Sequence, residues 1–346
     1  EHAFRKIREL AIIPDGAAYI AYPWATLIDK LQSGSKDARH HLAIFREFCQ
    51  MIPRDRITLT VCQHIHMRRY LHLFEEAGID HIFWSHATVD DARTAATSTR
   101  PAIRPFPLYP VQLSAAPAEQ ASADRLILYS FIGARANQHY PTQTRNWILD
   151  HLSKDPRGHV VGRDRWHYNQ VVYDHQVHSA TANPNVALAA RDISAEEEFK
   201  RSLGQSLFSL CPSGTGPNSI RLWESLGAGS IPVIMADQWA APGNRKLWEA
   251  AAVFCPETEE AVRGLPDRLA ALAADPEQLE AKRQAMRQLW MLYGPATFVY
   301  DILAFLIRLR PGATKWSQGN GAGRDTDAVR YLSHDSRTLL RRCAAD

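Results

Sequence analysis

Short runs of apolar residues alternate with longer segments in which apolar residues recur every three or four positions along most of the chain. Short apolar or β-branched runs predict strands, and the longer period predicts amphipathic helices. In the first part of the chain, Ile57–Cys62 (ITLTVC) predicts a strand, Arg68–Ala77 a helix and Ile79–Trp84 the next strand. This alternation predicts an α/β domain with a parallel sheet.

The same alternation resumes in the second part of the chain. Leu126–Ile132 predicts a strand, Thr144–Leu152 a helix and Gly158–Val161 another strand. Ala195–Gly204 then predicts a helix that Ser194 can cap. Further helices are predicted at Glu257–Ala274, Pro276–Tyr293 and Thr297–Arg308. The pattern therefore predicts a second α/β domain.

The composition changes between Thr99 and Ala123, where prolines gather and regular structure is not expected. We interpret this stretch as the last element of the first domain followed by a linker. The expected boundaries are 1–112 for the N-terminal domain, 113–124 for the linker, 125–310 for the C-terminal domain and 311–346 for a partly flexible tail. Within the tail, Asp325–Arg342 predicts a final helix.

The most informative segment, LFSLCPSGTGPNSIRLWESLGAGSIPVIMAD, runs from Leu207 to Asp237 and predicts a strand, a loop, a short helix and a second strand. Glycines in the loop leave room for backbone N–H groups to approach a ligand. Asn218 or Ser219 can cap the helix. The free amides and the dipole at its start favour an anion such as a diphosphate. Gly227 and Gly229 can end it.

Arg221 and Glu224 lie three residues apart and share one face of this predicted helix. The arginine offers a fixed positive fork to a phosphate, and the carboxylate can accept both hydroxyls of a ribose. An isolated pair of this kind more often forms a local ion pair on an ordinary helix. Here the flanking strands place the pair at the carboxyl end of a strand, where α/β folds bind ligands, which favours a nucleotide site.

The stretch CPSGTGPNSIRLWESLGAGSIPVI resembles the signature of the exostosin-like glycosyltransferases, which combines S/P-G, S-x-R-x-x-E and G-x-I-P-V-I. Weaker echoes occur in HIFWSHAT and LILYSFIGAR. The resemblance implies an α/β fold of two Rossmann-like domains facing a cleft, the GT-B architecture. It also implies that the second domain holds a nucleotide sugar, with Arg221 on the phosphate side and Glu224 on the ribose.

We expect residues of the second domain to bind the donor nucleotide. They are Ser213, Gly214, Thr215, Gly216, Asn218, Ser219, Arg221, Glu224 and Arg135. Arg135 follows a strand–glycine turn, and an ordinary surface role fits it equally well. The resemblance implies that the donor is bound without a metal ion, and no cofactor is expected. Amides and arginine would stabilise the leaving diphosphate in place of a metal.

Histidines after first-domain strands are the candidates for the catalytic base: His64, His66 and His86. An imidazole with a pKa near neutrality could take the proton of an acceptor hydroxyl at the edge of the cleft. The alternative for each is a histidine that only hydrogen-bonds a loop.

Composition limits the class of protein. Of the 346 residues 45% are hydrophobic and 22% charged, and the formal net charge of +3 is too small to favour nucleic acid as a partner. Five scattered cysteines without a CxxC pair predict neither a disulfide framework nor a zinc site. No apolar run approaches the roughly 20 residues of a membrane helix. We expect a cytoplasmic protein, free or peripheral at the inner membrane.

The expected function is transfer of a sugar, most simply from a UDP-linked donor, to an oligosaccharide or polysaccharide acceptor. For the family, direct displacement with inversion is expected, and we expect a role in bacterial surface polysaccharide synthesis, such as lipopolysaccharide or capsule. The sequence starts at Glu1 and not at a methionine, so other domains of a larger chain are also expected partners.

Two alternatives stay open at this point. One is a transferase for a CMP-Kdo-type keto-sugar acid, with retention through an aspartate nucleophile. The other is a non-catalytic subunit that binds nucleotide or polysaccharide.

Overall fold

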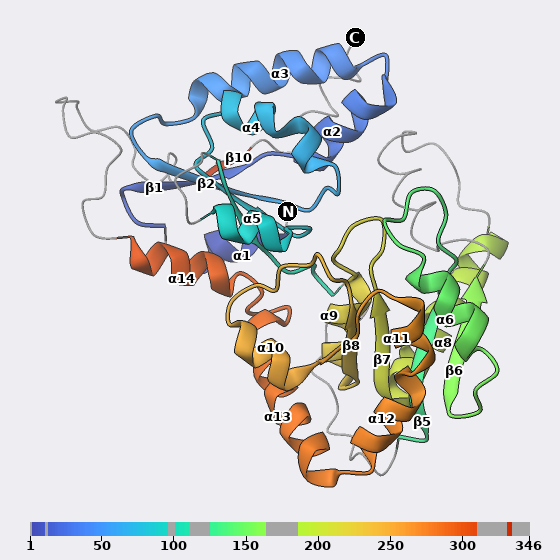
Figure 1. The fold of residues 1–346 in the computed structure, drawn as a ribbon. Helices are drawn as coiled ribbons and strands as arrows, with labels where there is room; N and C mark the ends of the chain where they lie inside the picture. The colour runs from blue at the N-terminus through green and yellow to red at the C-terminus, as the bar shows by residue number, and fades with distance from the viewer. Residues whose placement is uncertain are drawn as a thin grey trace. The chain divides into compact units, whose positions relative to one another are not determined.

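The computed structural model describes residues 2–10, 13–95, 101–110, 125–163, 186–309 and 331–333, and the chain divides into two compact units (Figure 1). The first unit comprises Glu1–Phe106 with Val299–Asp346, and the second is Pro107–Phe298. Each unit contains one five-stranded sheet whose neighbouring strands run parallel. The predicted α/β fold with two Rossmann-like units is confirmed.

The first unit has the strand order β10-β1-β2-β3-β4. Its strands are β1 (Ala17–Ala21), β2 (Ile57–Cys62), β3 (His81–Trp84), β4 (Ala102–Pro105) and β10 (Tyr331–Ser333). Its helices are α1 (His2–Leu10), α2 (Trp24–Ser33), α3 (Ala38–Met51), the 3-10 helix η1 (Met67–Tyr70), α4 (Leu71–Glu76), α5 (Val89–Thr94) and α14 (Tyr300–Arg308).

Aromatic side chains join the helices of the first unit to its sheet. The Trp24 ring stacks on Phe74 with centroids 4.0 Å apart, and its indole N–H donates to Thr60 Oγ1 at 2.8 Å. On α14, Phe305 lies 4.5 Å from the His81 ring, and the Arg104 guanidinium lies 4.6 Å from its centroid. These contacts attach α14 to β3 and β4.

The second unit has the strand order β6-β5-β7-β8-β9. Its strands are β5 (Ile127–Ala134), β6 (Gly158–Arg163), β7 (Ser206–Pro212), β8 (Ile231–Met235) and β9 (Val253–Phe254). The chain first steps from β5 to β6 and then returns to the opposite side of β5 at β7. The winding direction therefore reverses between β5 and β7, and open α/β sheets bind ligands outside the carboxyl ends of strands at such a point.

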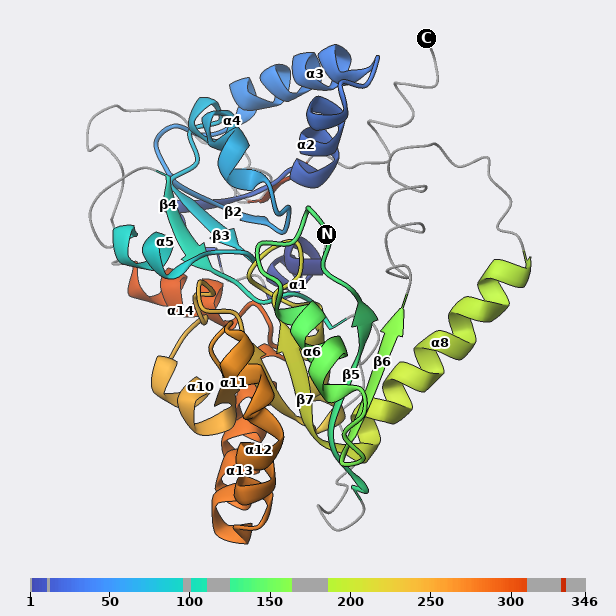
Figure 2. The ribbon, with the colours of Figure 1, turned by 45° about the vertical axis from the view of Figure 1, so that its right-hand side comes forward.

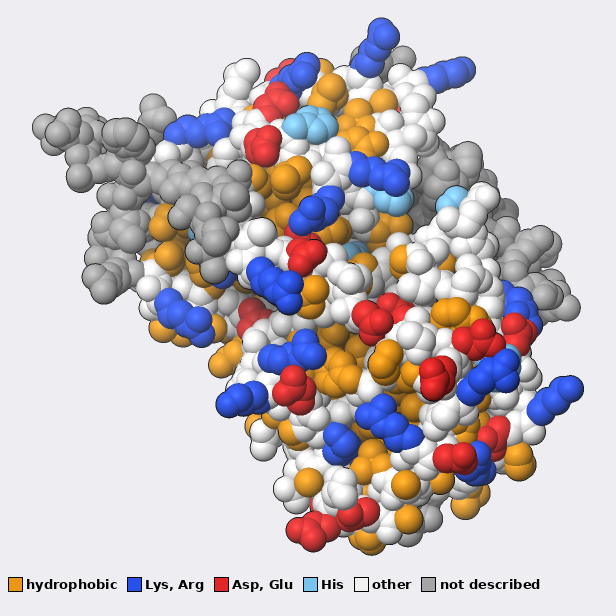
Figure 3. All heavy atoms as spheres, viewed as in Figure 1, with side chains coloured by type: hydrophobic (Ala, Val, Ile, Leu, Met, Phe, Trp, Pro, Cys, Tyr) orange, Lys and Arg blue, Asp and Glu red, His pale blue; other side chains and the backbone are white. Residues whose placement is uncertain are grey.

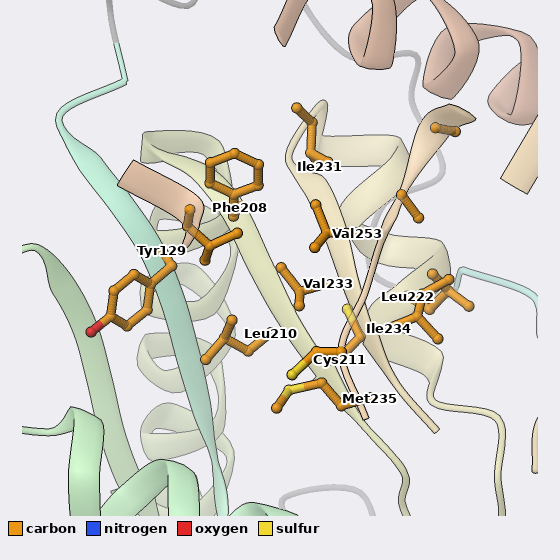
Figure 4. Close-up of a cluster of buried hydrophobic side chains, with 14 of the residues drawn as sticks. Tyr129, Phe208, Leu210, Cys211, Leu222, Ile231, Val233, Ile234, Met235 and Val253 are labelled. Carbon is orange, nitrogen blue, oxygen red and sulfur yellow. The ribbon is translucent and has the colours of Figure 1, made fainter. Parts of the chain in front are cut away.

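Helices cover both faces of the second sheet (Figure 2). They are α6 (Thr144–Leu152), α8 (Val186–Gln205), α9 (Ile220–Ala228), α10 (Arg245–Ala251), α11 (Glu259–Arg263), α12 (Leu265–Ala273) and α13 (Pro276–Tyr293). α6, α11 and α12 pack together on one side, and α8 and α9 pack on β5, β7 and β8 from the other. Side chains of β5, β7, β8 and β9 form a buried apolar cluster with Leu222 of α9 (Figure 4).

Several expected elements differ from the structure. The proline-rich stretch contains β4, because an edge strand tolerates proline at its ends, here Pro101 and Pro105. α8 begins at Val186, so Ser194 lies inside the helix and is not its N-cap; the residues before it, VALAAR, are mostly good helix formers. The predicted helix Glu257–Ala274 is divided at Gly264, which Pro266 follows in the first turn of α12.

The end of the chain also differs from expectation. Contacts place α14 in the first unit, so the second unit ends at Phe298 and not at residue 310. Tyr331–Ser333, expected in a final helix, instead pairs with β1 as the strand β10. This pairing satisfies backbone groups along an edge of β1 that would otherwise be open. The rest of the expected final helix lies outside the described residues.

Charged side chains of both signs are interspersed on the face shown in Figure 3. This distribution agrees with the small net charge of +3. Within the described ranges, no helix has the length and apolar content needed to cross a bilayer.

Candidate functional site

The start of α9 lies at the carboxyl end of β7, beside the point where the winding reverses. Ser219 occupies the N-cap position, but its side chain makes no capping hydrogen bond. The Leu222 N–H donates to the Ser219 carbonyl at 3.1 Å. The amides before it in the first turn have no intrahelical acceptor, so a ligand can use them. Gly229 ends the helix with φ 71°, a left-handed conformation that favours glycine, whereas Gly227 lies within it.

Arg221, in the first turn of α9, is buried, with 8% of its surface exposed. Its Nη2 donates to the Ile132 carbonyl on β5, while Nε and Nη1 have no hydrogen-bond partner within the described residues. The guanidinium lies 4.6 Å from the centroid of the Phe131 ring and 5.6 Å from that of Phe199. Burial lowers the pKa of Arg221 from its ordinary value, because the cation has lost its water.

A second buried arginine, Arg145, extends from the first turn of α6 to the same place. Its Nε donates to the Ser213 carbonyl at 3.0 Å and its Nη1 to the Ala134 carbonyl at 3.4 Å. Burial, followed by repulsion from Arg221, lowers its pKa to about 10, so it stays charged at neutral pH. A Cβ placed on Gly133 would lie 3.1 Å from Arg145 Nη1 and 3.2 Å from Arg221 Nη2. Both guanidinium groups therefore lie over one glycine at the end of β5.

Glu224 lies one turn after Arg221 and is 2% exposed. Its negative charge raises the pKa of Arg221 and so partly offsets the effect of burial. Asn218 is also buried, and its Oδ1 accepts the Trp223 indole N–H at 2.9 Å. Because Arg221 and Glu224 are both enclosed, they differ from the exposed ion pair that an ordinary surface helix would carry.

The loop before α9 uses part of its hydrogen-bonding capacity internally. Ser213 N–H donates to the Met235 carbonyl at 2.9 Å, and Gly214 N–H to the Gly216 carbonyl at 2.9 Å. A Cβ on Gly214 would have only the Gly216 oxygen nearby, at 3.9 Å, so the space beside Gly214 is open. Thr215 is exposed. The loop leaves room for a ligand, although two of its amides are already engaged.

Glu257, which follows β9, joins several loops at this end of the sheet. Its Oε1 accepts the hydroxyls of Ser213 at 2.6 Å and Thr142 at 2.8 Å. Its Oε2 accepts the Asp237 N–H at 3.0 Å, and its own N–H donates to Asp237 Oδ2 at 3.2 Å. The Ser213 hydroxyl proton is thus directed to Glu257.

Arg135 has a different setting from the other predicted donor-site residues. Its guanidinium is exposed, and Nη2 donates to Asp150 Oδ1 at 2.6 Å on α6. The structure places Arg145, and not Arg135, beside Arg221.

The three predicted histidines follow β2 and β3 in the first unit. His64 has both ring nitrogens engaged: Nε2 with Asp29 Oδ1 at 2.9 Å, and Nδ1 with the His66 N–H at 3.1 Å. His66 is half-buried, with its ring centroid 5.6 Å from that of His64. His86 is 6% exposed, and its Nδ1 has no partner among the residues that the structure describes.

His86 is expected to make stability depend on pH. Burial, with smaller contributions from His64 and His66, lowers its pKa to about 4. Between pH 6.5 and 4 the unfolded chain therefore binds a proton that the folded chain does not, and stability falls as pH falls. The free energy of unfolding of the wild type should decrease relative to that of His86→Gln by up to about 1.4 kcal/mol per pH unit in this range. Urea unfolding at several pH values measures this slope, and parallel pH profiles would contradict it.

Sequence reasoning missed Arg145 and Glu257. A signal for Arg145 was present, because it is basic and lies in the first turn of the helix predicted after the strand Leu126–Ile132. Glu257 follows the last strand of the sheet, but nothing near it in the sequence indicates its contact with Ser213. In the described part of the chain, no group of three or more His, Cys, Asp or Glu side chains could hold a metal ion.

Comparisons with known proteins agree with the signature. The Exostosin GT47 domain matches residues 68–263, which is more than half of the chain. Exostosin-1 of Drosophila melanogaster is 33% identical over 97 residues, which span 28% of this chain and 12% of that protein. "Probable glucuronosyltransferase GUT1" of Oryza sativa subsp. japonica is 34% identical over 98 residues, 28% of this chain and 22% of that protein.

Among solved structures, the pneumococcal O-GlcNAc transferase GtfA in complex with UDP and GlcNAc aligns with 88% of this chain and 60% of that chain, with 12% identity and a TM-score of 0.43. The matched segments thus span a small part of the curated relatives, while the family match itself contains Arg145, Arg221, Glu224 and Glu257. The chain belongs to the Exostosin GT47 domain family.

Proposed function

We propose that the chain is a glycosyltransferase that takes a sugar from a nucleotide-sugar donor and transfers it to a carbohydrate acceptor. The observation that carries this proposal is the buried Arg221 in the first turn of α9, one turn from the buried Glu224. Two of the Arg221 nitrogens have no hydrogen-bond partner among the residues that the structure describes. The guanidinium would bind the phosphate next to the sugar, and the carboxylate would accept the ribose hydroxyls. Membership in the family supports the same activity.

In the proposed mechanism, negative charge develops on the leaving phosphate as the bond to the sugar breaks. Arg221 and the free amides at the start of α9 would stabilise this charge from fixed positions, which lowers the barrier without rearrangement. The resemblance supports displacement with inversion and without a metal ion. A base must also take the proton of the acceptor hydroxyl, and His64, His66 and His86 stay the candidates for this role. The cleft between the units, the bacterial polysaccharide acceptor and the cytoplasmic location stay predictions.

The nucleotide half of the proposal is tested by thermal unfolding with UDP. UDP at 100 times its Kd should stabilise the wild type by about 2.7 kcal/mol and raise its Tm. Glu224→Gln should lose most of this increase, because the ribose hydroxyls lose a charged acceptor while the side-chain volume is kept. Glu260→Gln, at an exposed acid of the same unit, is the matched control and should keep the full increase. An equal increase in Glu224→Gln would contradict the ribose assignment.

A donor-hydrolysis screen over UDP-, GDP- and CMP-sugars tests the activity and separates the alternatives. Turnover of a CMP-linked keto-sugar acid and not of UDP-sugars would favour the CMP-Kdo-type reaction. Binding of UDP without turnover or transfer of any donor would favour a non-catalytic subunit. A strict requirement for Mn²⁺ or Mg²⁺ would contradict the metal-independent mechanism.

A further inference from the structure

The signature around Arg221 accounts for one cation at the switch point, but the structure has two. Arg145 comes from α6 and Arg221 from α9, and the ends of both lie over Gly133. Two buried cations repel each other, and each has lost water. Such an arrangement destabilises the folded protein unless other groups of the protein compensate for the two charges. Buried cations of this kind are typical of sites that bind a ligand of opposite charge.

The compensation within the protein is partial. In the described part of the chain, main-chain carbonyls accept all the hydrogen bonds that these guanidinium groups make: Ser213 and Ala134 for Arg145, and Ile132 for Arg221. The Phe131 ring lies 5.7 Å from one guanidinium and 4.6 Å from the other, which offsets some of the cost. Both Nε and Nη1 of Arg221 are left without acceptors among the described residues.

We propose that Arg145 is a second phosphate-binding residue, so that Arg145 and Arg221 together bind the two phosphates of a nucleoside diphosphate leaving group. This inference rests on the proposed function and narrows it to diphosphate-linked donors. Two fixed forks match two adjacent phosphates, because each guanidinium can donate to one of them. A nucleoside monophosphate would leave one buried cation uncompensated, which disfavours a CMP-linked donor. Because Gly133 has no side chain, the two guanidinium groups can both lie against it, close enough to bind one ligand.

Ser213 and Glu257 position Arg145 in this arrangement. Ser213 directs its hydroxyl to Glu257, and its carbonyl accepts the Nε–H of Arg145. Ser213 therefore acts on the phosphate through Arg145 and not through its own hydroxyl. Glu257 in turn fixes Ser213 relative to the loops of Thr142 and Asp237.

Calorimetric titration of the full chain with UDP, UMP and pyrophosphate tests the inference. Arg145→Gln should weaken binding of UDP by about 10- to 100-fold and of pyrophosphate by a similar factor, but binding of UMP by less than about threefold. The UDP affinity of Arg145→Lys should lie between those of the wild type and Arg145→Gln, because lysine keeps the charge but loses the hydrogen bond to the Ser213 carbonyl. Arg245→Gln, at an exposed arginine paired with Glu249, is the matched control and should change none of the affinities.

Gly133→Ala is the second variant, and it keeps every charge. Its methyl group would press on the Phe131 ring and on both guanidinium ends. It should weaken the binding of UDP more than the binding of UMP, which gives a test even if Arg145→Gln does not fold. The inference is overturned if Arg145→Gln binds UDP with a Kd within twofold of that of the wild type. It is also overturned if Arg145→Gln weakens the binding of UDP and the binding of UMP by the same factor.

The same titrations separate failure of this inference from failure of the proposed function. If the wild type binds UDP and Arg221→Gln abolishes binding while Arg145→Gln does not, the inference fails and the proposed function stands. If the wild type binds pyrophosphate through Arg145 but no nucleotide, the proposed function fails instead.

Discussion

Replacing Arg221 by glutamine is expected to slow turnover of the sugar donor by about 100- to 1,000-fold, the effect of removing one fixed donor from a site where negative charge develops. Arg221 is enclosed, so water cannot take its place, and its guanidinium is held at the end of β5 by the Ile132 carbonyl. The loss should appear mainly in kcat, because the charge on the leaving phosphate is larger in the transition state than in the bound donor. The measurement is steady-state kinetics with the donor that the screen identifies.

The large loss of turnover in Arg221→Gln should not be accompanied by a comparable loss of stability of the ligand-free protein. Removal of one of two neighbouring buried cations relieves repulsion with Arg145, so the Tm without ligand should stay equal or rise. Arg221→Lys is the informative companion, because it keeps the charge without the planar fork. Retention of kcat/KM within threefold of the wild type in Arg221→Gln would contradict the proposed role.

Replacing Arg125 by methionine is expected to lower the free energy of unfolding by about 3 kcal/mol, since several buried carbonyls lose their donor at once. Arg125 Nη1 donates to the carbonyls of Leu203 at 3.1 Å and Ser206 at 2.8 Å, and Nη2 to that of Ala228 at 2.9 Å. One guanidinium thus satisfies carbonyls at the carboxyl ends of α8 and α9. Burial lowers the pKa of Arg125 to about 10, so it remains charged at neutral pH.

Urea unfolding measures this loss, and Arg268→Met serves as its control. Arg268 also donates to a main-chain carbonyl, that of Phe254 at 2.8 Å, but it is exposed, so water can replace it. Equal effects of the two substitutions would contradict the role assigned to Arg125. Because Ala228 ends the helix that begins beside Arg221, Arg125→Met should also weaken UDP binding in the fraction that stays folded.

Much of the fold could be predicted, because its elements carry local signals. Ile57–Cys62 is β-branched, and Thr144–Leu152 and Pro276–Tyr293 have helical spacing; the structure has these elements with the same bounds. β4 and β10 could not be predicted in this way. Their residues form strands because a neighbouring strand offers an edge, and that information lies elsewhere in the chain.

The site was predictable only where it is contiguous. Arg221 and Glu224 share one helix, so their spacing alone places them together. Arg145 reaches the same region from α6 and Glu257 from the loop after β9, and only the strand order brings these two segments together. The cap of this helix was harder to predict. Ser219 has the expected N-cap position but makes no capping hydrogen bond, and Asn218 Oδ1, the other expected cap, accepts the Trp223 indole N–H.

The division of the chain affects the order in which its parts can fold during synthesis. The second unit is one unbroken segment, Pro107–Phe298, whereas the first needs residues from both ends of the chain. Domains generally fold as units while the chain emerges from the ribosome. The second unit can therefore complete its sheet while the first still lacks α14 and the strand beside β1. The unit that begins later in the chain can therefore mature first, and the N-terminal unit must wait for residues that are translated only after the whole second unit.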